Sequence, residues 1–270
     1  MSFIPVKELR KKYHVRPSKG LGQNFLVDNS ILNKIVSSSQ VKETDVVLEI
    51  GPGTGNLTQE LIKIVKTVIA VEKDPKMTEI LKETFKNLKN IEIVQADILK
   101  AKELKIKNYK IVANLPFYLT APVIKKFLEA ENPPKDMTLV IQKEVAQRIC
   151  VKVPDMNLLA VSVQFYAQPK IISYISKNSF WPKPKVDSAI IKIVPKEELR
   201  EKALRDLFFK IAKAGFSQPR KQIINNLSKG LKVERGRTAE WLLKNNIQPT
   251  QRAETLSVED WIKLTKSFKI

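Results

Sequence analysis

The segment from Glu49 to Asn56, Glu-Ile-Gly-Pro-Gly-Thr-Gly-Asn, constrains the fold more than any other part of the chain. The apolar run 46–48 enters it with the composition of a buried strand, and apolar residues at helical spacing follow it. Glycines at alternate positions let the backbone turn tightly and let a ligand approach without meeting a Cβ. This pattern predicts a nucleotide-type cofactor site at the carboxyl edge of a parallel sheet, with an ordinary strand-to-helix turn as the plainer alternative.

Strand and helix patterns alternate around this loop. We predict strands at 46–50, 67–72, 91–96, 109–113 and 137–142, and helices at 29–38, 56–65, 75–87 and 120–130. Such alternation is typical of βαβ units in a mostly parallel, doubly wound sheet. Later strands near 170–176 and 188–194 are expected to extend it. Residues 1–195 are therefore predicted to form an α/β, Rossmann-like domain.

The pattern changes at about residue 196. From there only helices are predicted, at 197–213, 219–228, 236–245 and 257–267. Ser257 and Asp260 have the spacing of a capping box at the start of the last helix. Residues 196–270 contain 17 Lys and Arg but only 9 Asp and Glu, which makes them more basic per residue than the rest. We predict a small all-helical C-terminal domain with the boundaries 196–270.

The charge of the chain indicates what it binds. The formal net charge is +20, and a basic arm precedes the first helix, with Lys7, Arg10, Lys11, Lys12 and Arg16. An excess of this size favours binding to a polyanion over a merely solvated basic surface, and it favours RNA over a membrane as that partner. No apolar run approaches the ~20 residues that span a bilayer, and no secretory segment is recognisable. We therefore expect a cytoplasmic protein.

Cysteine and histidine are scarce, which excludes several classes of site. Cys150 is the single cysteine and His14 the single histidine. One chain therefore cannot build a disulfide framework, a Cys/His zinc site or an iron–sulfur cluster held by several cysteines, and no metal site is expected. A Ser-His-Asp triad could use only His14, which lies in the basic arm. Catalysis must proceed without an imidazole base or rely on that one residue.

Two acidic residues follow predicted strands. Glu72 ends the second strand, where an acid commonly accepts hydrogen bonds from the ribose hydroxyls of a nucleotide. Asp97 follows the third strand, where it could accept from an exocyclic adenine amine. The alternatives are a solvated carboxylate for Glu72 and an N-cap for Asp97.

The fourth strand runs into Asn114-Leu115-Pro116-Phe117-Tyr118. Proline stiffens this turn, the Asn114 side chain and the Leu115 backbone offer carbonyl acceptors, and Phe117 can stack on a planar ring. Two acceptors and one aromatic face suit an aromatic amine. Tyr118 is expected to point elsewhere. The alternative is a loop that carries a core phenylalanine.

With these motifs the chain resembles the small-subunit ribosomal RNA adenine N6,N6-dimethyltransferases, which use S-adenosylmethionine (SAM). The resemblance covers nearly the whole chain and rests on these segments: 22–26, 49–55, Glu72, Asp97, 114–117, 180–188, 216–221 and 252–257. The family usually has tyrosine at the position of Phe117 and tends to have a basic residue at that of Pro219. The last two segments favour the ribosome-assembly enzymes over related enzymes that modify large-subunit RNA.

The resemblance implies a role for each matching residue. Asn24 and Leu26 would close over SAM, and Gly51 would approach its methionine part. Glu72 would bind the ribose, Asp97 the adenine, and Asn114 would lie between cofactor and target base. Asn114, Leu115, Pro116 and Phe117 would form the catalytic loop. The implied reaction is dimethylation of two adjacent adenosines near the 3′ end of small-subunit (16S-type) rRNA, by a monomer bound to the small-subunit precursor. A large-subunit rRNA methyltransferase and a mainly non-catalytic assembly factor remain alternatives.

Overall fold

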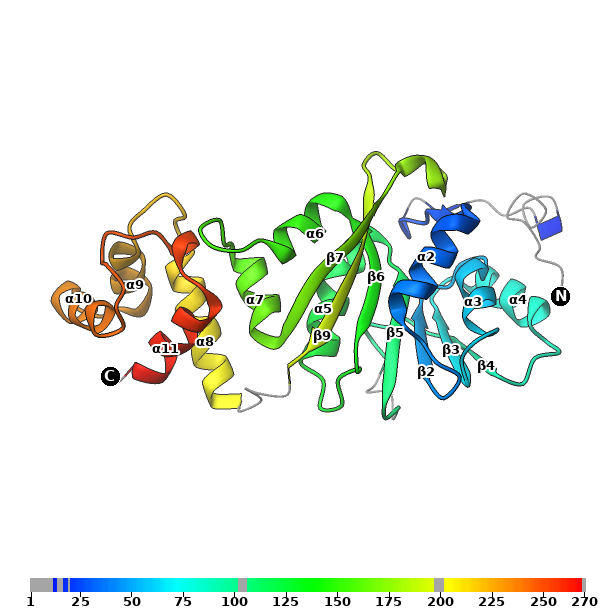
Figure 1. Ribbon diagram of the computed structural model, residues 1–270, viewed down its shortest axis with the longest axis horizontal. Coiled ribbons are helices and arrows are strands. Elements are labelled where there is room, and N and C mark those ends of the chain that lie inside the picture. The colour runs from blue at the N-terminus through cyan, green and yellow to red at the C-terminus, as the bar shows by residue number, and fades with distance from the viewer. Residues whose placement is uncertain (1–11, 14–16, 19, 102–105, 197–201, 269–270) are drawn as a thin grey trace. The chain divides into compact units, whose positions relative to one another are not determined.

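The computed structural model describes residues 12–13, 17–18, 20–101, 106–196 and 202–268. Within them, seven strands form one sheet in the order β4-β3-β2-β5-β6-β9-β7 (Figure 1). The first five strands in this order are parallel, and β9 is antiparallel to β6. The strands are β2 (Val46–Ile50), β3 (Thr67–Glu72), β4 (Ile91–Gln95), β5 (Tyr109–Asn114), β6 (Met137–Gln142), β7 (Ala167–Ile175) and β9 (Ser188–Pro195). The predicted doubly wound sheet is confirmed.

Helices cover both faces of this sheet. They are α2 (Asn29–Ser39), α3 (Asn56–Leu61), α4 (Pro75–Thr84) and α5 (Thr120–Leu128). Successive strand residues point to opposite faces, so Val112 packs with the apolar residues of α2 and α3. On the other face Tyr109 meets Phe127 of α5 edge-on, with 6.5 Å between ring centroids. Figure 1 shows α2 and α5 on opposite sides of the sheet. The sheet that carries the glycine loop therefore has an apolar core on each of its two faces.

Several predicted boundaries were wrong. The helix predicted at 56–65 ends at Leu61, so that Ile64 is 37% exposed, and those at 75–87 and 120–130 also end two or three residues early. Two further helices, α6 (Lys143–Cys150) and α7 (Leu158–Tyr166), were not predicted. The apolar residues of α7 are not confined to one face, which removes the helical periodicity from its sequence.

A short second sheet was also missed. Strand β1 (Phe25–Leu26) pairs antiparallel with β8 (Phe180–Trp181), and the Phe25 ring stacks on that of Trp181 at a centroid distance of 6.1 Å. Two-residue strands carry no sequence period. This pairing fixes the segment before α2 against a part of the chain more than 150 residues later.

Contacts divide the chain into two compact units. The first runs to Ala146 and includes Pro169–Pro195, and the second comprises Gln147–Gln168 and Lys196–Ile270. The predicted domain boundary at 195/196 therefore misses residues 147–168, which belong with the C-terminal helices. The reason is apolar packing, because the Phe165 ring of α7 stacks on the Phe208 ring of α8 (Lys202–Gly215) at a centroid distance of 4.0 Å.

The second unit is helical, as predicted. Its helices after residue 196 are α8 (Lys202–Gly215), α9 (Ile223–Leu231), α10 (Arg235–Lys244) and α11 (Val258–Ser267). Trp261 is fully buried at its centre. The capping box is confirmed, since Ser257 Oγ accepts the Asp260 N–H at 3.1 Å and Asp260 Oδ2 accepts the Ser257 N–H at 3.0 Å. This bond pair fixes where α11 begins.

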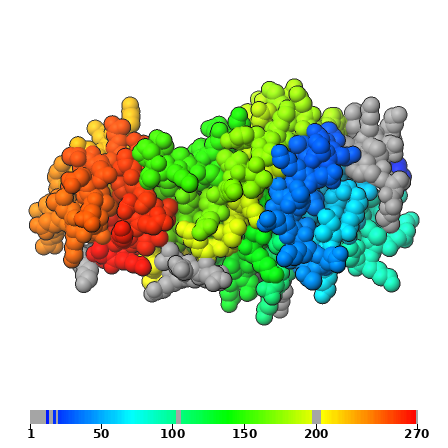
Figure 2. All heavy atoms as spheres, in the orientation of Figure 1, coloured from blue at the N-terminus to red at the C-terminus, as the bar shows by residue number. Residues whose placement is uncertain are grey.

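The basic arm falls mostly outside the described residues, as do Lys7, Arg10, Lys11, His14 and Arg16. Lys12 is described, and its ammonium pairs with Glu83 at 3.0 Å. Across the described ranges no helix has the length and hydropathy needed to cross a membrane. Figure 2 shows the yellow-green atoms of the β7 region at the surface beside the blue atoms of α2, where Lys34 donates to Ser173 Oγ at 2.6 Å.

Candidate active site

The glycine loop joins β2 to α3 with an unusual backbone. Gly51 and Gly53 have φ angles of +67° and +58°, which residues with a side chain rarely adopt. A Cβ at Gly53 would lie 2.8 Å from Cε1 of Phe25. The Gly51 N–H donates to the Val71 carbonyl at 2.9 Å, so the loop is anchored to the end of β3. The predicted tight turn is confirmed, and a side chain at Gly53 would have to displace the ring above it.

Glu72 closes the next strand and is held by this loop. Its Oε2 accepts the Gly53 N–H at 3.0 Å, and its Oε1 accepts the N–H groups of Lys73 and Asp74 at 2.8 Å each. Burial raises the pKa of the Glu72 carboxyl, and these three N–H donors oppose that rise. A carboxylate has about four lone-pair sites, so Oε2 retains one for a hydroxyl donor. The solvated alternative is wrong, since the side chain is buried.

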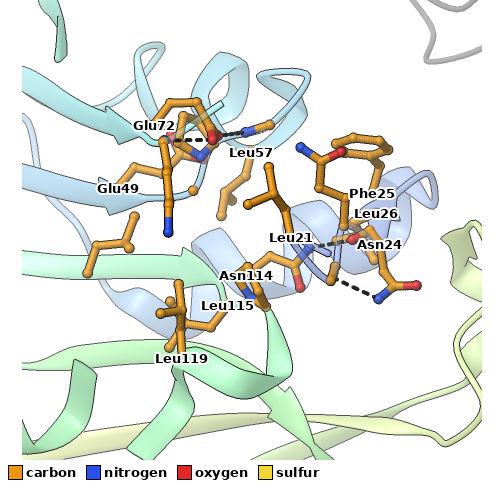
Figure 3. Close-up of a pocket in the computed structure, with 18 of the residues that line it drawn as sticks. Leu21, Asn24, Phe25, Leu26, Glu49, Leu57, Glu72, Asn114, Leu115 and Leu119 are labelled. Carbon is orange, nitrogen blue, oxygen red and sulfur yellow. Dashed lines mark hydrogen bonds between the residues drawn. The ribbon is translucent and has the colours of Figure 1, made fainter. Parts of the chain in front are cut away.

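Glu49 is a second buried acid of the pocket. It is 1% exposed, and no described residue donates to its Oε2. Burial, together with the nearby charge of Glu72, raises the pKa of its carboxyl to about 8. Figure 3 shows Glu49 and Glu72 on the same side of the pocket. No role was predicted for Glu49, although its place just before the glycines is a usable sequence signal.

Asp97 follows β4 and does two things. Its Oδ1 accepts the Leu99 N–H at 3.0 Å, which is the turn-capping role considered as an alternative. Its Oδ2 pairs with the Lys73 ammonium at 3.0 Å. The hydrogen bond from Lys73 lowers the pKa of Asp97. Asp97 is therefore an ionised acceptor on the pocket lining.

Asn114 ends β5 and faces the N-terminal segment (Figure 3). Its Nδ2 donates to the Asn24 carbonyl at 3.0 Å. Because the amide nitrogen is directed at Asn24, the amide orientation is fixed, and Oδ1 is the acceptor that this side chain offers. The segment itself is tied down by a bond from Asn56 Nδ2 to the Leu26 carbonyl at 2.7 Å. A residue 90 positions away thus sets the orientation of the Asn114 amide.

The loop after Asn114 lies next to the glycine loop. Pro116 Cδ is 3.8 Å from the place where a Gly51 Cβ would lie. Leu115 is buried, and its N–H donates to the Val140 carbonyl at 3.1 Å. Phe117 is half-buried at the start of a 3₁₀ turn, Phe117–Leu119. Phe180 of β8 is 5% exposed and lines the same pocket, although no role was predicted for it.

One pocket brings the predicted site residues together. It is lined by all the predicted site residues: Asn24, Leu26, Gly51, Glu72, Asp97, Asn114, Leu115, Pro116 and Phe117. Its lining also includes residues that were not predicted, among them Leu21, Glu49, Leu57, Lys73, Ile98 and Phe180. Carboxyl groups that can accept hydrogen bonds, set beside apolar walls, suit a nucleoside-bearing ligand.

Comparison with known families agrees with this geometry. The family model for ribosomal RNA adenine dimethylase matches residues 16–269. The chain belongs to this family. Family members are SAM-dependent methyltransferases. The acceptor site that Glu72 Oε2 retains fits the ribose hydroxyls of such a cofactor, and a positive charge near Glu49, whose Oε2 accepts from no described residue, would favour the ionised form of that carboxyl. The predicted fold class, cofactor and enzyme class are thereby confirmed.

Individual dimethylase relatives cover almost the whole chain. A "Ribosomal RNA small subunit methyltransferase A" of Dehalococcoides mccartyi (strain CBDB1) is 44% identical over 97% of this chain and 92% of its own length. One of the same name from Alkaliphilus oremlandii is 40% identical over 94% and 93%. A solved dimethyladenosine transferase from Plasmodium falciparum is 27% identical with a TM-score of 0.75, over 88% and 94%. The solved 23S rRNA methyltransferase ErmE is 26% identical with a TM-score of 0.74, and the match covers 90% of this chain and 98% of that one.

Proposed function

We propose that this chain is a SAM-dependent dimethyltransferase that acts on the N6 amines of two adjacent adenosines near the 3′ end of small-subunit rRNA, in the course of small-subunit biogenesis. The observation that carries the proposal is the oriented Asn114 amide, whose nitrogen donates to the Asn24 carbonyl and whose oxygen accepts no hydrogen bond from the part of the chain that the structure describes. The names of the relatives support the choice of small-subunit RNA, since those at 40–44% identity are small-subunit enzymes and the 23S enzyme is 26% identical.

The cofactor would lie between the glycine loop and the N-terminal segment. Glu72 Oε2 would accept a ribose hydroxyl, Asp97 the adenine amine, and Gly51 would allow the methionine part to approach the backbone. When bound, SAM supplies an electrophilic methyl group. Asn24 and Leu26 would exclude water from above, because hydrogen bonds to Asn114 and Asn56 hold their backbone carbonyls in place.

The target amine is a weak nucleophile because its lone pair is delocalised into the adenine ring. Acceptance of its two N–H protons by Asn114 Oδ1 and the Leu115 carbonyl would favour a tetrahedral nitrogen with a localised lone pair. Phe117 would stack on the extruded base and aim N6 at the methyl group, and positioning of this kind can contribute several orders of magnitude without a strong base. The second methylation has one N–H left, so it needs only one of the two acceptors.

The helical unit is proposed to bind the RNA backbone. The exposed loop 217–222 presents Arg220 and Lys221, and the buried amide of Asn226 shapes it by donating to the carbonyls of Gly215 at 2.6 Å and Gln218 at 2.9 Å. Arg235 reaches the first turn of α9, where it donates to Asn225. Such fixed, exposed cations suit phosphates, and RNA affinity should fall steeply with salt.

We further infer that the enzyme works as a monomer in the cytoplasm. One chain supplies every residue assigned to cofactor and target amine, so the mechanism needs no second copy. Light scattering of the purified protein at working concentration tests this, and a stable dimer would contradict it.

The proposed function is tested by mass mapping of N6-dimethyladenosine after reaction with unmodified small-subunit particles and, in parallel, with large-subunit RNA. Two adjacent dimethylated adenosines in the small-subunit RNA alone are expected. Methylation of only the large-subunit RNA would favour the 23S-type alternative. Absence of methylation on either RNA, together with tight binding of small-subunit precursors, would favour an assembly factor.

A further inference from the structure

Tyr118 differs from the other aromatic residues around the pocket because it is exposed. It lies on the 3₁₀ turn Phe117–Leu119, where three residues complete one turn and successive side chains point about 120° apart. Leu119 turns inward and is 8% exposed, whereas Tyr118 is 49% exposed and lies on the pocket lining. An exposed ring at a pocket rim is available to a partner that arrives from outside.

The Tyr118 ring is supported on one side. Its Cδ1 and Cε1 atoms lie 3.5 and 3.6 Å from the place where a Cβ of Gly22 would be, and Pro116 Cβ lies 3.7 Å from the same place. Gly22 has a φ of +59°, which favours glycine and leaves this space to the ring. A ring that lies next to the Gly22 backbone loses little freedom when a second flat group stacks on its exposed side.

Lys73 lines the same pocket as Tyr118. Its ammonium pairs with Asp97 at 3.0 Å, and its side chain is 51% exposed. The hydrogen bond to Asp97 raises the pKa of Lys73, which keeps this side chain in its charged form. An ammonium has three donors, so the bond to Asp97 leaves others for a phosphate.

The pocket suits one cofactor and one extruded base, yet that base remains attached to its RNA strand. The neighbouring nucleotide must therefore pass over the rim. We propose that Tyr118 and Lys73 form a rim subsite for the nucleotide next to the target adenosine, in which Tyr118 stacks on its base and Lys73 contacts its phosphate. This inference rests on the proposed function, and it identifies how the strand, beyond the reacting base, is held.

The test measures RNA affinity of Tyr118→Ala and Tyr118→Phe with a small-subunit RNA hairpin, intact or abasic at the 5′ or the 3′ neighbour of the target. Tyr118→Ala should bind the intact hairpin about 5- to 150-fold more weakly than the wild type does, because one stacking contact is lost. Tyr118→Phe should bind as the wild type does. One of the two abasic hairpins should abolish the difference between wild type and Tyr118→Ala.

Tyr174→Ala is the matched control, because Tyr174 is 50% exposed in the same unit but does not line the pocket. It should leave hairpin affinity unchanged. SAM affinity and melting temperature are measured on all variants. Unchanged hairpin affinity of Tyr118→Ala, an equal loss on both abasic hairpins, or a loss confined to SAM affinity would each overturn the rim subsite. Failure of the proposed function would give a different result, because the wild-type protein would then methylate no adenosine.

Discussion

Replacement of Asn114 by alanine separates chemistry from binding. The change removes the acceptor assigned to the target amine and also the 3.0 Å hydrogen bond to the Asn24 carbonyl. The lost bond should cost about 0.5–1.5 kcal/mol of stability, or a few degrees in melting temperature for a protein of this size. Loss of one oriented partner of the transition state should lower the methylation rate about 10²- to 10³-fold. RNA affinity should hardly change, because phosphate contacts dominate it.

The assay is single-turnover methylation of unmodified small-subunit particles at saturating SAM, with the melting temperature measured on the same preparations. Asn90→Ala is a matched control, because Asn90 Nδ2 donates to the Ile62 carbonyl at 2.9 Å and does not line the pocket. It should show a similar loss of stability and a normal rate. A folded Asn114→Ala enzyme with a near-normal rate, or an equal rate loss in Asn90→Ala, would refute the assigned role.

Three further predictions concern the cofactor side of the pocket. The carboxyl of Glu49 has its pKa raised from 4.5 to about 8, so between these values the folded protein keeps a proton that the unfolded chain has lost. The free energy of unfolding should therefore fall as pH rises from about 5 to 8, by at most about 1.4 kcal/mol per pH unit for this group. Denaturant titrations at several pH values should show a smaller pH dependence for Glu49→Gln than for the wild type. Glu72→Gln should weaken SAM binding by about 1.5–3 kcal/mol in calorimetry, and an unchanged affinity would exclude the ribose role. Gly53→Ala should destabilise the fold by at least about 1–2 kcal/mol, since φ is +58° and the Cβ would meet Phe25 at 2.8 Å; a melting temperature equal to that of the wild type would contradict this.

Much of the fold was determined by local sequence. Periodicity and composition identified the parallel strands and the C-terminal helices, because an apolar run or stripe must be buried whatever surrounds it. The glycine loop and Ser257 act through backbone conformation and short-range hydrogen bonds, so their structures follow from neighbouring residues. The same locality explains why Glu72, Asp97 and Asn114 could be assigned to one sheet edge, since the carboxyl ends of parallel strands meet there.

Other features were decided only by the tertiary structure. The pairing of β1 with β8 and the bond between Asn114 and Asn24 join residues that are far apart in the chain, and no local pattern encodes such a partner. Helix α7 was invisible as a periodic pattern because it packs among the C-terminal helices with apolar residues on more than one face. The raised pKa of Glu49 likewise arises from burial next to Glu72, which the sequence places 23 residues away and the fold places beside it. The sequence thus determined which side chains reach the sheet edge, whereas the tertiary structure decided which of their atoms remain free to act, because long-range contacts occupy the others.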